Sequence, residues 1–368
     1  MNTGFGLEEA VRKARAETGV PGVAAGLLRA GETVVAADGV LELGRDEPVR
    51  PDTPFRIASI TKPFTATLAA ATVGLDERMC ALLSHTAGLR CESARPLPPP
   101  AAGLWSYSNA GYQEAGAACG ARFDAAMSRH VLEPLGLTST GFTEPAAPAR
   151  GHVQEGDSGH RAVSSDLYPP ERWPSGGLWS TASDLLRFAS YQLDGAPAAL
   201  HEPRAGALGA QYALGWWVRR DAAGRTTLDH EGSVAGYQSL LLLVPTESLA
   251  LAVLTNSWRG SGLARRVVES LGLLRRPAVA RAERDDVAGT YSLDDVEASV
   301  ELSRDGIVVA DAETDPVTGT RRSTRYAAQP LGGDVYGFAH GTLMSHRLDF
   351  PRAGVARIGW VALTDTGR

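Results

Sequence analysis

The stretch TPFRIASITKP, residues 53–63, carries the pattern that decides the fold. Within it, Ser59 stands three residues before Lys62, and the following residues predict a helix over about 60–72. Pro63 is compatible with this helix, because the first N–H groups of a helix have no intrahelical partner. Residues i and i+3 share one helix face, so the Ser59 hydroxyl and the Lys62 amine are expected within hydrogen-bond reach.

A serine becomes a strong nucleophile when a neighbouring base removes its proton, and a desolvated lysine can be that base. The helix N-terminus adds backbone donors where an oxyanion would form. The alternative is a helix-capping serine followed by a surface lysine. Lys13 and Lys62 are the only lysines, and every other basic residue except histidine is arginine. Because lysine, unlike arginine, can act as a base, this scarcity favours a chemical role for Lys62.

The second pattern is Tyr107-Ser108-Asn109. A phenol near a lysine can relay protons to a leaving group, and an amide side chain can donate to a substrate carbonyl. The alternative is a turn with a packed tyrosine.

The third pattern is His230-Glu231-Gly232-Ser233, at the end of a strand that we expect from Thr226. Strand alternation places His230 and Gly232 on one face, and a glycine lets a substrate backbone approach the strand edge. The N–H of Ser233 is then a candidate second oxyanion donor beside that of Ser59. The alternative is a strand-end histidine next to a turn.

In this order, Ser-x-x-Lys, Tyr-x-Asn and His-x-Gly resemble the active-site serine family of class C β-lactamases, D-Ala-D-Ala carboxypeptidases (penicillin-binding proteins) and related esterases. The resemblance covers about residues 5–275. Its supporting stretches are residues 53–63, LLSHTAGL at 82–89, EPLGL at 133–137, SGGLWST at 175–181 and Gly236-Tyr237.

The resemblance implies that Ser59 forms an acyl-enzyme and that Lys62 and Tyr107 share the base and acid work, with the first base left open. It also implies that Asn109 orients the substrate. His230 occupies a place where many relatives have a lysine, so a free substrate carboxylate would be bound less strongly. No cofactor and no metal are implied.

The resemblance and the strand pattern together predict an α/β (α+β) fold, with an antiparallel sheet of N- and C-terminal strands flanked by helices. Segments that are long and helical in relatives are short here, so we expect a reduced helical region and a reshaped acyl pocket. We expect single strands over 212–219, 226–230, 237–244 and 248–254. The predicted domains are a catalytic domain, 1–278, and a small β-rich, lipocalin-like domain, 285–368, joined by a linker over 277–285.

The composition is that of a globular protein, with 43% hydrophobic residues and a net charge of −6. An acidic balance disfavours nucleic acid or an anionic membrane as partner. The N-terminus lacks a signal-peptide pattern and no apolar run is long enough for a bilayer, so we expect a cytoplasmic protein. The three cysteines have no metal spacing and are expected to be free thiols.

GDSGH at 156–160 is interpreted as a loop, and His152 with His160 as a weak metal signal. The predicted function is a serine hydrolase that acts on an ester or amide of a small-molecule or peptide-like acyl group. The alternatives are a transacylase that passes the acyl group to an amine or alcohol, as in natural-product biosynthesis, and a catalytically silent binding module. The oligomeric state stays open.

Overall fold

The computed structural model describes most of the chain. The described residues are 3–99, 101–155, 159–164, 168–221, 224–273, 287–294, 296–303, 306–314, 321–332, 335–337, 348–352, 355–358 and 361–365.

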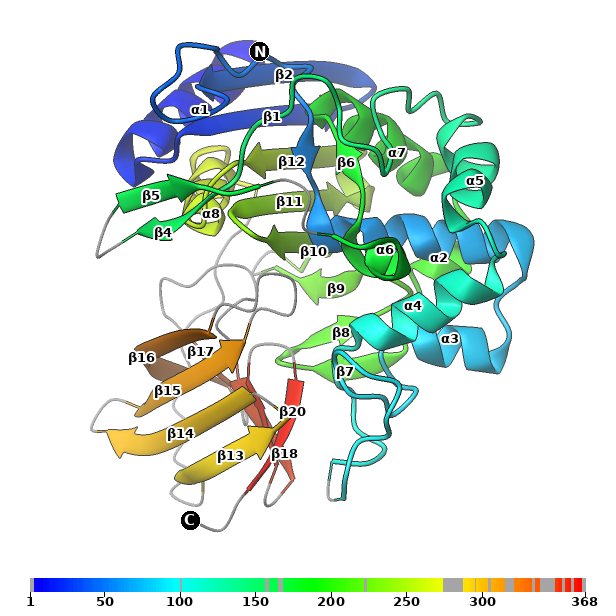
Figure 1. Ribbon diagram of the computed structural model, residues 1–368, viewed down its shortest axis with the longest axis vertical. Helices are drawn as coiled ribbons and strands as arrows, with labels where there is room; N and C mark the ends of the chain where they lie inside the picture. The colour runs from blue at the N-terminus through cyan, green and yellow to red at the C-terminus, as the bar shows by residue number, and fades with distance from the viewer. Residues whose placement is uncertain are drawn as a thin grey trace.

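An antiparallel sheet of eight strands forms the centre of the larger, N-terminal part of the molecule (Figure 1). Its strand order is β2-β1-β12-β11-β10-β9-β8-β7, so strands from both ends of this part pair directly, with Gly26 of β1 opposite Ala252 of β12. The strands are β1 (Gly22–Arg29), β2 (Glu32–Gly39), β7 (Ala205–Ala207), β8 (Ala210–Tyr212), β9 (Trp217–Arg220), β10 (Thr226–Val234), β11 (Tyr237–Val244) and β12 (Leu249–Thr255).

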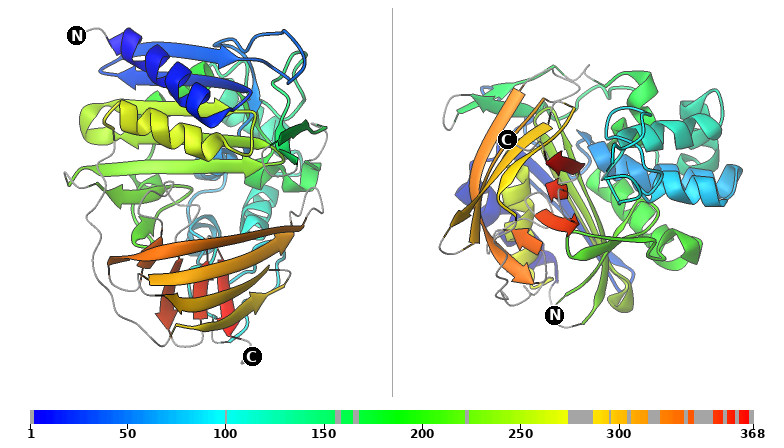
Figure 2. Two further views of the ribbon diagram at one scale, coloured as in Figure 1. Left: turned by 90° about the vertical axis from the view of Figure 1, so that its left-hand side faces the viewer. Right: turned by 90° about the horizontal axis from the view of Figure 1, so that it is seen from below.

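Helices cover both faces of this sheet (Figure 2). One face is covered by α1 (Thr3–Thr18) and α8 (Gly260–Ser270). The other is covered by α7 (Ala182–Asp194), and α2 (Thr61–Thr72) packs against α7. The Thr181 side chain accepts a hydrogen bond from the Asp184 N–H and so caps α7. Shorter helices surround α2: α3 (Glu77–Leu83), α4 (Asn109–Ala118), α5 (Phe123–Met127) and α6 (Trp173–Gly176).

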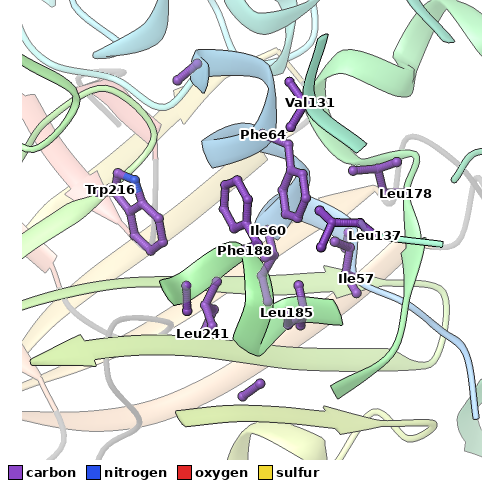
Figure 3. Close-up of a cluster of buried hydrophobic side chains, with 14 of the residues drawn as sticks. Ile57, Ile60, Phe64, Val131, Leu137, Leu178, Leu185, Phe188, Trp216 and Leu241 are labelled. Carbon is purple, nitrogen blue, oxygen red and sulfur yellow. The ribbon is translucent and has the colours of Figure 1, made fainter. Parts of the chain in front are cut away.

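The core between α2, α7 and the sheet fixes where α2 begins (Figure 3). Phe64 of α2 stacks on Phe188 of α7, with ring centroids 3.7 Å apart, and both side chains are fully buried. Ile57 and Ile60 on either side of Ser59 are also fully buried. Burying four large apolar side chains, at about 1.5–3 kcal/mol each, anchors the turn that carries Ser59.

Eight further strands close into a small barrel in the C-terminal part of the chain (Figure 1). They are β13 (Gly289–Leu293), β14 (Val296–Ser303), β15 (Gly306–Thr314), β16 (Arg321–Gly332), β17 (Val335–Gly337), β18 (Leu348–Arg352), β19 (Val355–Ile358) and β20 (Val361–Asp365). Leu97 and Ala101 from the segment before Tyr107 belong to the same buried apolar cluster as the barrel interior.

Polar contacts join this barrel to the β7–β8 hairpin and to the segment before Tyr107. Arg357 and Asp349 form a buried two-bond ion pair, with both distances 2.6 Å. Asp349 also accepts the Leu208 N–H at 2.8 Å, and Arg357 donates to the Gly206 carbonyl at 3.2 Å. The Ala362 N–H donates to the Ser106 hydroxyl at 3.1 Å, so the barrel contacts two segments of the larger part.

The predicted fold class is confirmed, and one predicted strand is wrong. The expected strand over 212–219 is two strands, β8 and β9, because Gly215 takes a left-handed φ of 87° and the Ala213 N–H bonds to the Trp216 carbonyl. The predicted linker, 277–285, lies outside the described residues, so the domain boundaries stay predictions. In the described part of the chain, no helix combines the length and apolar character needed to cross a bilayer.

Arg357→Met is expected to lower the free energy of unfolding by about 3–5 kcal/mol, because it leaves the Asp349 carboxylate buried without its cation. The measurement is urea unfolding followed by fluorescence and circular dichroism. The matched control is Arg325→Met, which breaks an exposed ion pair with Glu301 and is expected to cost less than about 1 kcal/mol. Equal losses in the two variants would contradict the prediction.

Candidate active site

Ser59 lies in a one-turn 3-10 helix, Ala58–Ile60, immediately before α2. The preceding strand β3 (Phe55–Arg56) pairs with β6 (Trp179–Ser180), which fixes the entry to this turn. Ala58 has a φ of 46°, a left-handed conformation that costs about 1–3 kcal/mol in a residue other than glycine. This strained turn leaves Ser59 partly exposed, while its neighbours Ala58 and Ile60 are buried.

Lys62 is fully buried and its amine contacts three oxygens. The Nζ atom lies 3.1 Å from the Ser59 Oγ, 2.7 Å from the Asn109 Oδ1 and 2.7 Å from the Ser175 carbonyl oxygen. Burial lowers the pKa of Lys62 to about 7, and the Arg172 cation adds to this. Cys91 and Glu92 act in the opposite direction. The amine therefore loses its proton much more readily than an exposed lysine does.

The three contacts also orient the neutral amine. A carbonyl oxygen is an acceptor only, so two N–H bonds of Lys62 point to Asn109 and Ser175. The lone pair of the amine is then left facing the Ser59 hydroxyl. This geometry is that of a general base beside its nucleophile.

Glu92 sets the orientation of the Asn109 amide. Asn109 donates from Nδ2 to a Glu92 carboxylate oxygen at 2.6 Å, which forces its Oδ1 toward Lys62. The other Glu92 oxygen accepts from Arg172, also at 2.6 Å. Both side chains are largely buried, with 14% of Arg172 and 30% of Glu92 exposed, so this ion pair is poorly screened.

Tyr107 lies against both reacting groups. Its hydroxyl hydrogen-bonds the Ser59 side chain, and its ring centroid is 4.6 Å from the Lys62 amine. Burial raises the pKa of Tyr107 well above its usual value, although the bond to Ser59 opposes this. At neutral pH the side chain is thus a neutral phenol.

His230 is buried on β10, and both of its ring nitrogens have partners. Its Nδ1 lies 2.7 Å from the Glu231 carbonyl oxygen and its Nε2 lies 3.1 Å from the Tyr212 hydroxyl. Burial and the nearby Lys62 lower the pKa of His230 to about 3, so the ring is neutral. Its centroid is 6.3 Å from that of Tyr107, which places the third motif beside the second.

The absence of a side chain at Gly232 allows Ile57 and Ser239 to pack closely against it. A Cβ at this position would lie 2.1 Å from the Ile57 carbonyl oxygen and 2.3 Å from the Ser239 Oγ. The strand pattern predicted that a substrate approaches at this glycine; the space it provides is instead filled by the segment that leads to Ser59. Contact of Gly232 with a substrate stays a prediction.

Ser233 has a backbone N–H that faces away from β11. In the two-residue hairpin that joins β10 to β11, Val234 and Tyr237 form the closing pair, which is hydrogen-bonded. Hydrogen-bonded and non-bonded pairs alternate along antiparallel strands, so Ser233 belongs to a non-bonded pair. The pairing of β10 with β9 ends at Asp229. The Ser233 N–H is therefore directed to the open side of β10, as an oxyanion donor requires.

Several polar residues near this site were not predicted from the sequence: Glu92, Arg172, Ser175, His85 and Tyr212. His85 and Ser175 lie within stretches that supported the family resemblance, but those stretches gave them no role. Glu92 lies in a proline-rich segment without helical or strand periodicity, so no pattern indicated it.

The two histidines considered for a metal have protein partners instead. They lie on paired strands β4 (His152–Glu155) and β5 (Gly159–Ala162). His152 bonds the Asn256 carbonyl and the Leu43 N–H, and His160 bonds the Ser257 hydroxyl. The described residues contain no cluster of three histidine, cysteine or acidic side chains that would hold a metal ion. Residues 156–158 of GDSGH lie outside them.

A comparison with protein families matches residues 7–77 and 78–272 to the beta-lactamase family. The chain belongs to the beta-lactamase family. Among curated relatives, penicillin-binding protein 4 of Amycolatopsis lactamdurans is 28% identical, over 75% of this chain and 94% of that protein. A beta-lactamase of Lysobacter lactamgenus is 30% identical, over 51% of this chain and 60% of the relative.

Solved structures show the same fold. SurE, also solved with D-Leu, aligns with a TM-score of 0.73 and 24% identity over 98% of each chain. The D-amino acid amidase of Ochrobactrum anthropi SV3 aligns with a TM-score of 0.63 and 21% identity, over 74% of this chain and 99% of the amidase. The likeness to SurE extends through the C-terminal barrel.

Charge changes beside Lys62 are expected to move its pKa in opposite directions. Only the neutral amine can take the Ser59 proton, so the rate of Ser59 acylation by an activated ester should rise with pH through about 7. Glu92→Gln removes an anion that raises the Lys62 pKa, and it should shift this rise to lower pH. Arg172→Gln removes a cation and should shift it to higher pH.

The measurement is the pH profile of acylation under single-turnover conditions. Arg122→Gln, at an exposed position paired with Asp124, is the control and should leave the profile unchanged. Shifts of the same sign in the two site variants would contradict the assignment of this rise to Lys62.

Proposed function

We propose that this protein is a serine acyl hydrolase that forms an acyl-enzyme on Ser59 with an ester or amide substrate. The observation that supports this most strongly is the buried Lys62 amine, whose two N–H bonds are held by Asn109 and Ser175 and whose lone pair faces Ser59. Burial that lowers the Lys62 pKa to about 7, next to a partly exposed serine, is typical of a general base.

In the proposed reaction, Lys62 removes the Ser59 proton as the Oγ atom attacks the substrate carbonyl. The N–H groups of Ser59 and Ser233 stabilise the resulting oxyanion. Tyr107, a neutral phenol in contact with Ser59, donates its proton to the leaving group and is reprotonated by the Lys62 ammonium. Water then attacks the acyl-enzyme, and the same groups return the proton to Ser59.

The proposed substrate is a small peptide-like ester or amide in which a D-amino acid is one component. Two proteins of the same fold support this: SurE holds D-Leu, and the Ochrobactrum enzyme is a D-amino acid amidase. His230, a neutral ring with both nitrogens occupied, supplies no cation for a free substrate carboxylate. We therefore favour a substrate whose scissile carbonyl is not next to a free C-terminal carboxylate.

Transfer of the acyl group to an amine is the second candidate. The D-Leu bound to SurE carries an amine, which is the chemical group that an aminolysis reaction needs. The binding-module alternative is disfavoured by the complete contacts among Ser59, Lys62 and Tyr107.

Incubation with a fluorophosphonate is expected to add one probe mass to the wild-type protein and none to Ser59→Ala, by intact-mass spectrometry. A probe adduct on Ser59→Ala would show that another residue is the nucleophile. Absence of an adduct on the wild type would favour the binding module.

Lys62→Arg is expected to slow acylation of Ser59 by about 10²- to 10⁴-fold, because arginine keeps the positive charge but cannot accept the proton. The measurement is the rate of acylation by an activated ester, with circular dichroism to verify folding. An acylation rate within about threefold of the wild type would exclude Lys62 as the base.

Hydrolysis and transfer are separated by the products from D- and L-amino acid esters and amides, with and without an added amine. If the reaction is hydrolysis, the product is the free acid and its rate of formation does not depend on the amine. The proposed substrate class predicts faster turnover of the D-enantiomers. A conjugate that replaces the acid as amine is added would support transfer. Equal turnover of D- and L-substrates would overturn the substrate class.

A further inference from the structure

Three buried aromatic side chains connect the second and third motifs through hydrogen bonds. The His85 Nε2 lies 3.2 Å from the Tyr212 hydroxyl, which in turn lies 3.1 Å from the His230 Nε2. The three side chains are 2%, 0% and 0% exposed, so no bulk water competes for these groups. They come from the loop after α3, from β8 and from β10.

Backbone groups at both ends fix the direction of this chain of bonds. The Ser108 N–H donates to the His85 Nδ1 at 3.0 Å, which makes Nδ1 an acceptor and leaves the proton of His85 on Nε2. The Glu231 carbonyl accepts from the His230 Nδ1 at 2.7 Å, so His230 holds its proton there. Tyr212 consequently accepts from His85 and donates to the Nε2 lone pair of His230.

Burial lowers the pKa of His230 and keeps the ring neutral, as this direction requires, and the nearby cations add to the effect. Lys62 and Arg219 both oppose a second positive charge in the same buried region. Asp229, also buried, contacts Arg219 at 2.9 Å. On the other side, the Tyr112 hydroxyl donates to the Leu83 carbonyl at 2.6 Å and also hydrogen-bonds Tyr212, where its oxygen competes with the His230 Nε2 for the Tyr212 proton.

The His85 end of this chain holds the segment that carries Tyr107. The His85 carbonyl accepts the Ser106 N–H and its Nδ1 accepts the Ser108 N–H, so His85 bonds the residues on both sides of Tyr107. The ring centroids of His85 and Tyr107 are 4.3 Å apart. His85 itself has a left-handed φ of 61°, a conformation that these contacts must stabilise.

We infer that His85, Tyr212 and His230 form a directional hydrogen-bond relay that positions Tyr107 against Ser59, with Tyr212 as the positioning residue that joins the two histidines. In this arrangement His230 acts through Tyr212 and His85 and does not transfer a proton. The inference about Tyr107 rests on the proposed function, whereas the direction of the relay does not.

The first test measures the two histidine tautomers and needs no substrate. Two-bond ¹⁵N–¹H correlation spectra of ¹⁵N-histidine-labelled protein at pH 7, assigned with His85→Gln and His230→Gln, should show a proton on Nε2 of His85 and on Nδ1 of His230. In Tyr212→Phe, the Nε2 resonance of His230 should move toward that of a ring nitrogen without a donor. The same tautomer on both rings, or a charged ring, would overturn the relay.

The second test is kinetic. Tyr212→Phe removes one hydroxyl and is expected to lower the acylation rate of Ser59 by about ten- to a hundredfold, with a smaller change in KM. The control is Tyr237→Phe, which removes an equally buried hydroxyl that bonds the Ala149 carbonyl at 2.9 Å, and should lower the rate less than about threefold. Equal losses in the two variants would reduce Tyr212 to a structural residue.

A double-mutant cycle tests whether Tyr212 and His230 act together. If they belong to one relay, Tyr212→Phe combined with His230→Gln should be no more than about threefold slower than the slower single variant. Losses that multiply would show independent roles and overturn the relay. Because the tautomers are read without catalysis, failure of the relay remains distinguishable from failure of the proposed acyl-enzyme.

Discussion

The site depends on the removal of the Lys62 amine from water. Two oxygens, of Asn109 and Ser175, accept its N–H bonds, and the third contact is the Ser59 hydroxyl. Burial lowers its pKa, and the Asn109 and Ser175 oxygens decide where its lone pair points. Much of the surrounding structure serves this constraint. Glu92 orients Asn109, Arg172 holds Glu92, and the strained turn at Ala58 presents Ser59 to the amine. A small change in any of these would alter the direction or the basicity of the amine.

The sequence predicted this centre because its two main members are local. Ser59 and Lys62 share a helix face, and the flanking isoleucines and Phe64 place that helix in the core. Motif order then predicted that Tyr107, Asn109 and His230 would approach them. Glu92 and Tyr212 were not predictable in this way, because their contacts join segments far apart in the chain and their roles depend on the direction of single hydrogen bonds. Strand periodicity likewise did not show the break at Gly215.

Two separate sets of bonds contact the proposed acid, Tyr107, and the proposed base, Lys62. The Glu92–Asn109 contact acts on Lys62, whereas the His85–Tyr212–His230 relay acts on the segment of Tyr107. The sets meet at Ser108 and Asn109, which begin α4: Ser108 caps the helix, its N–H bonds His85, and the next residue bonds Lys62. A helix N-terminus therefore connects the orientation of the base to that of the acid.

The hydrogen bonds from the barrel to Leu208 and Ser106 also affect the order in which the site is assembled during translation. Asp349, Arg357 and Ala362 hold the hairpin that leads to Tyr212 and the segment that leads to Tyr107. A ribosome makes these three residues after every residue of the site. The nascent chain thus contains Ser59, Lys62 and Tyr107 before it contains the barrel residues that contact the neighbouring segments.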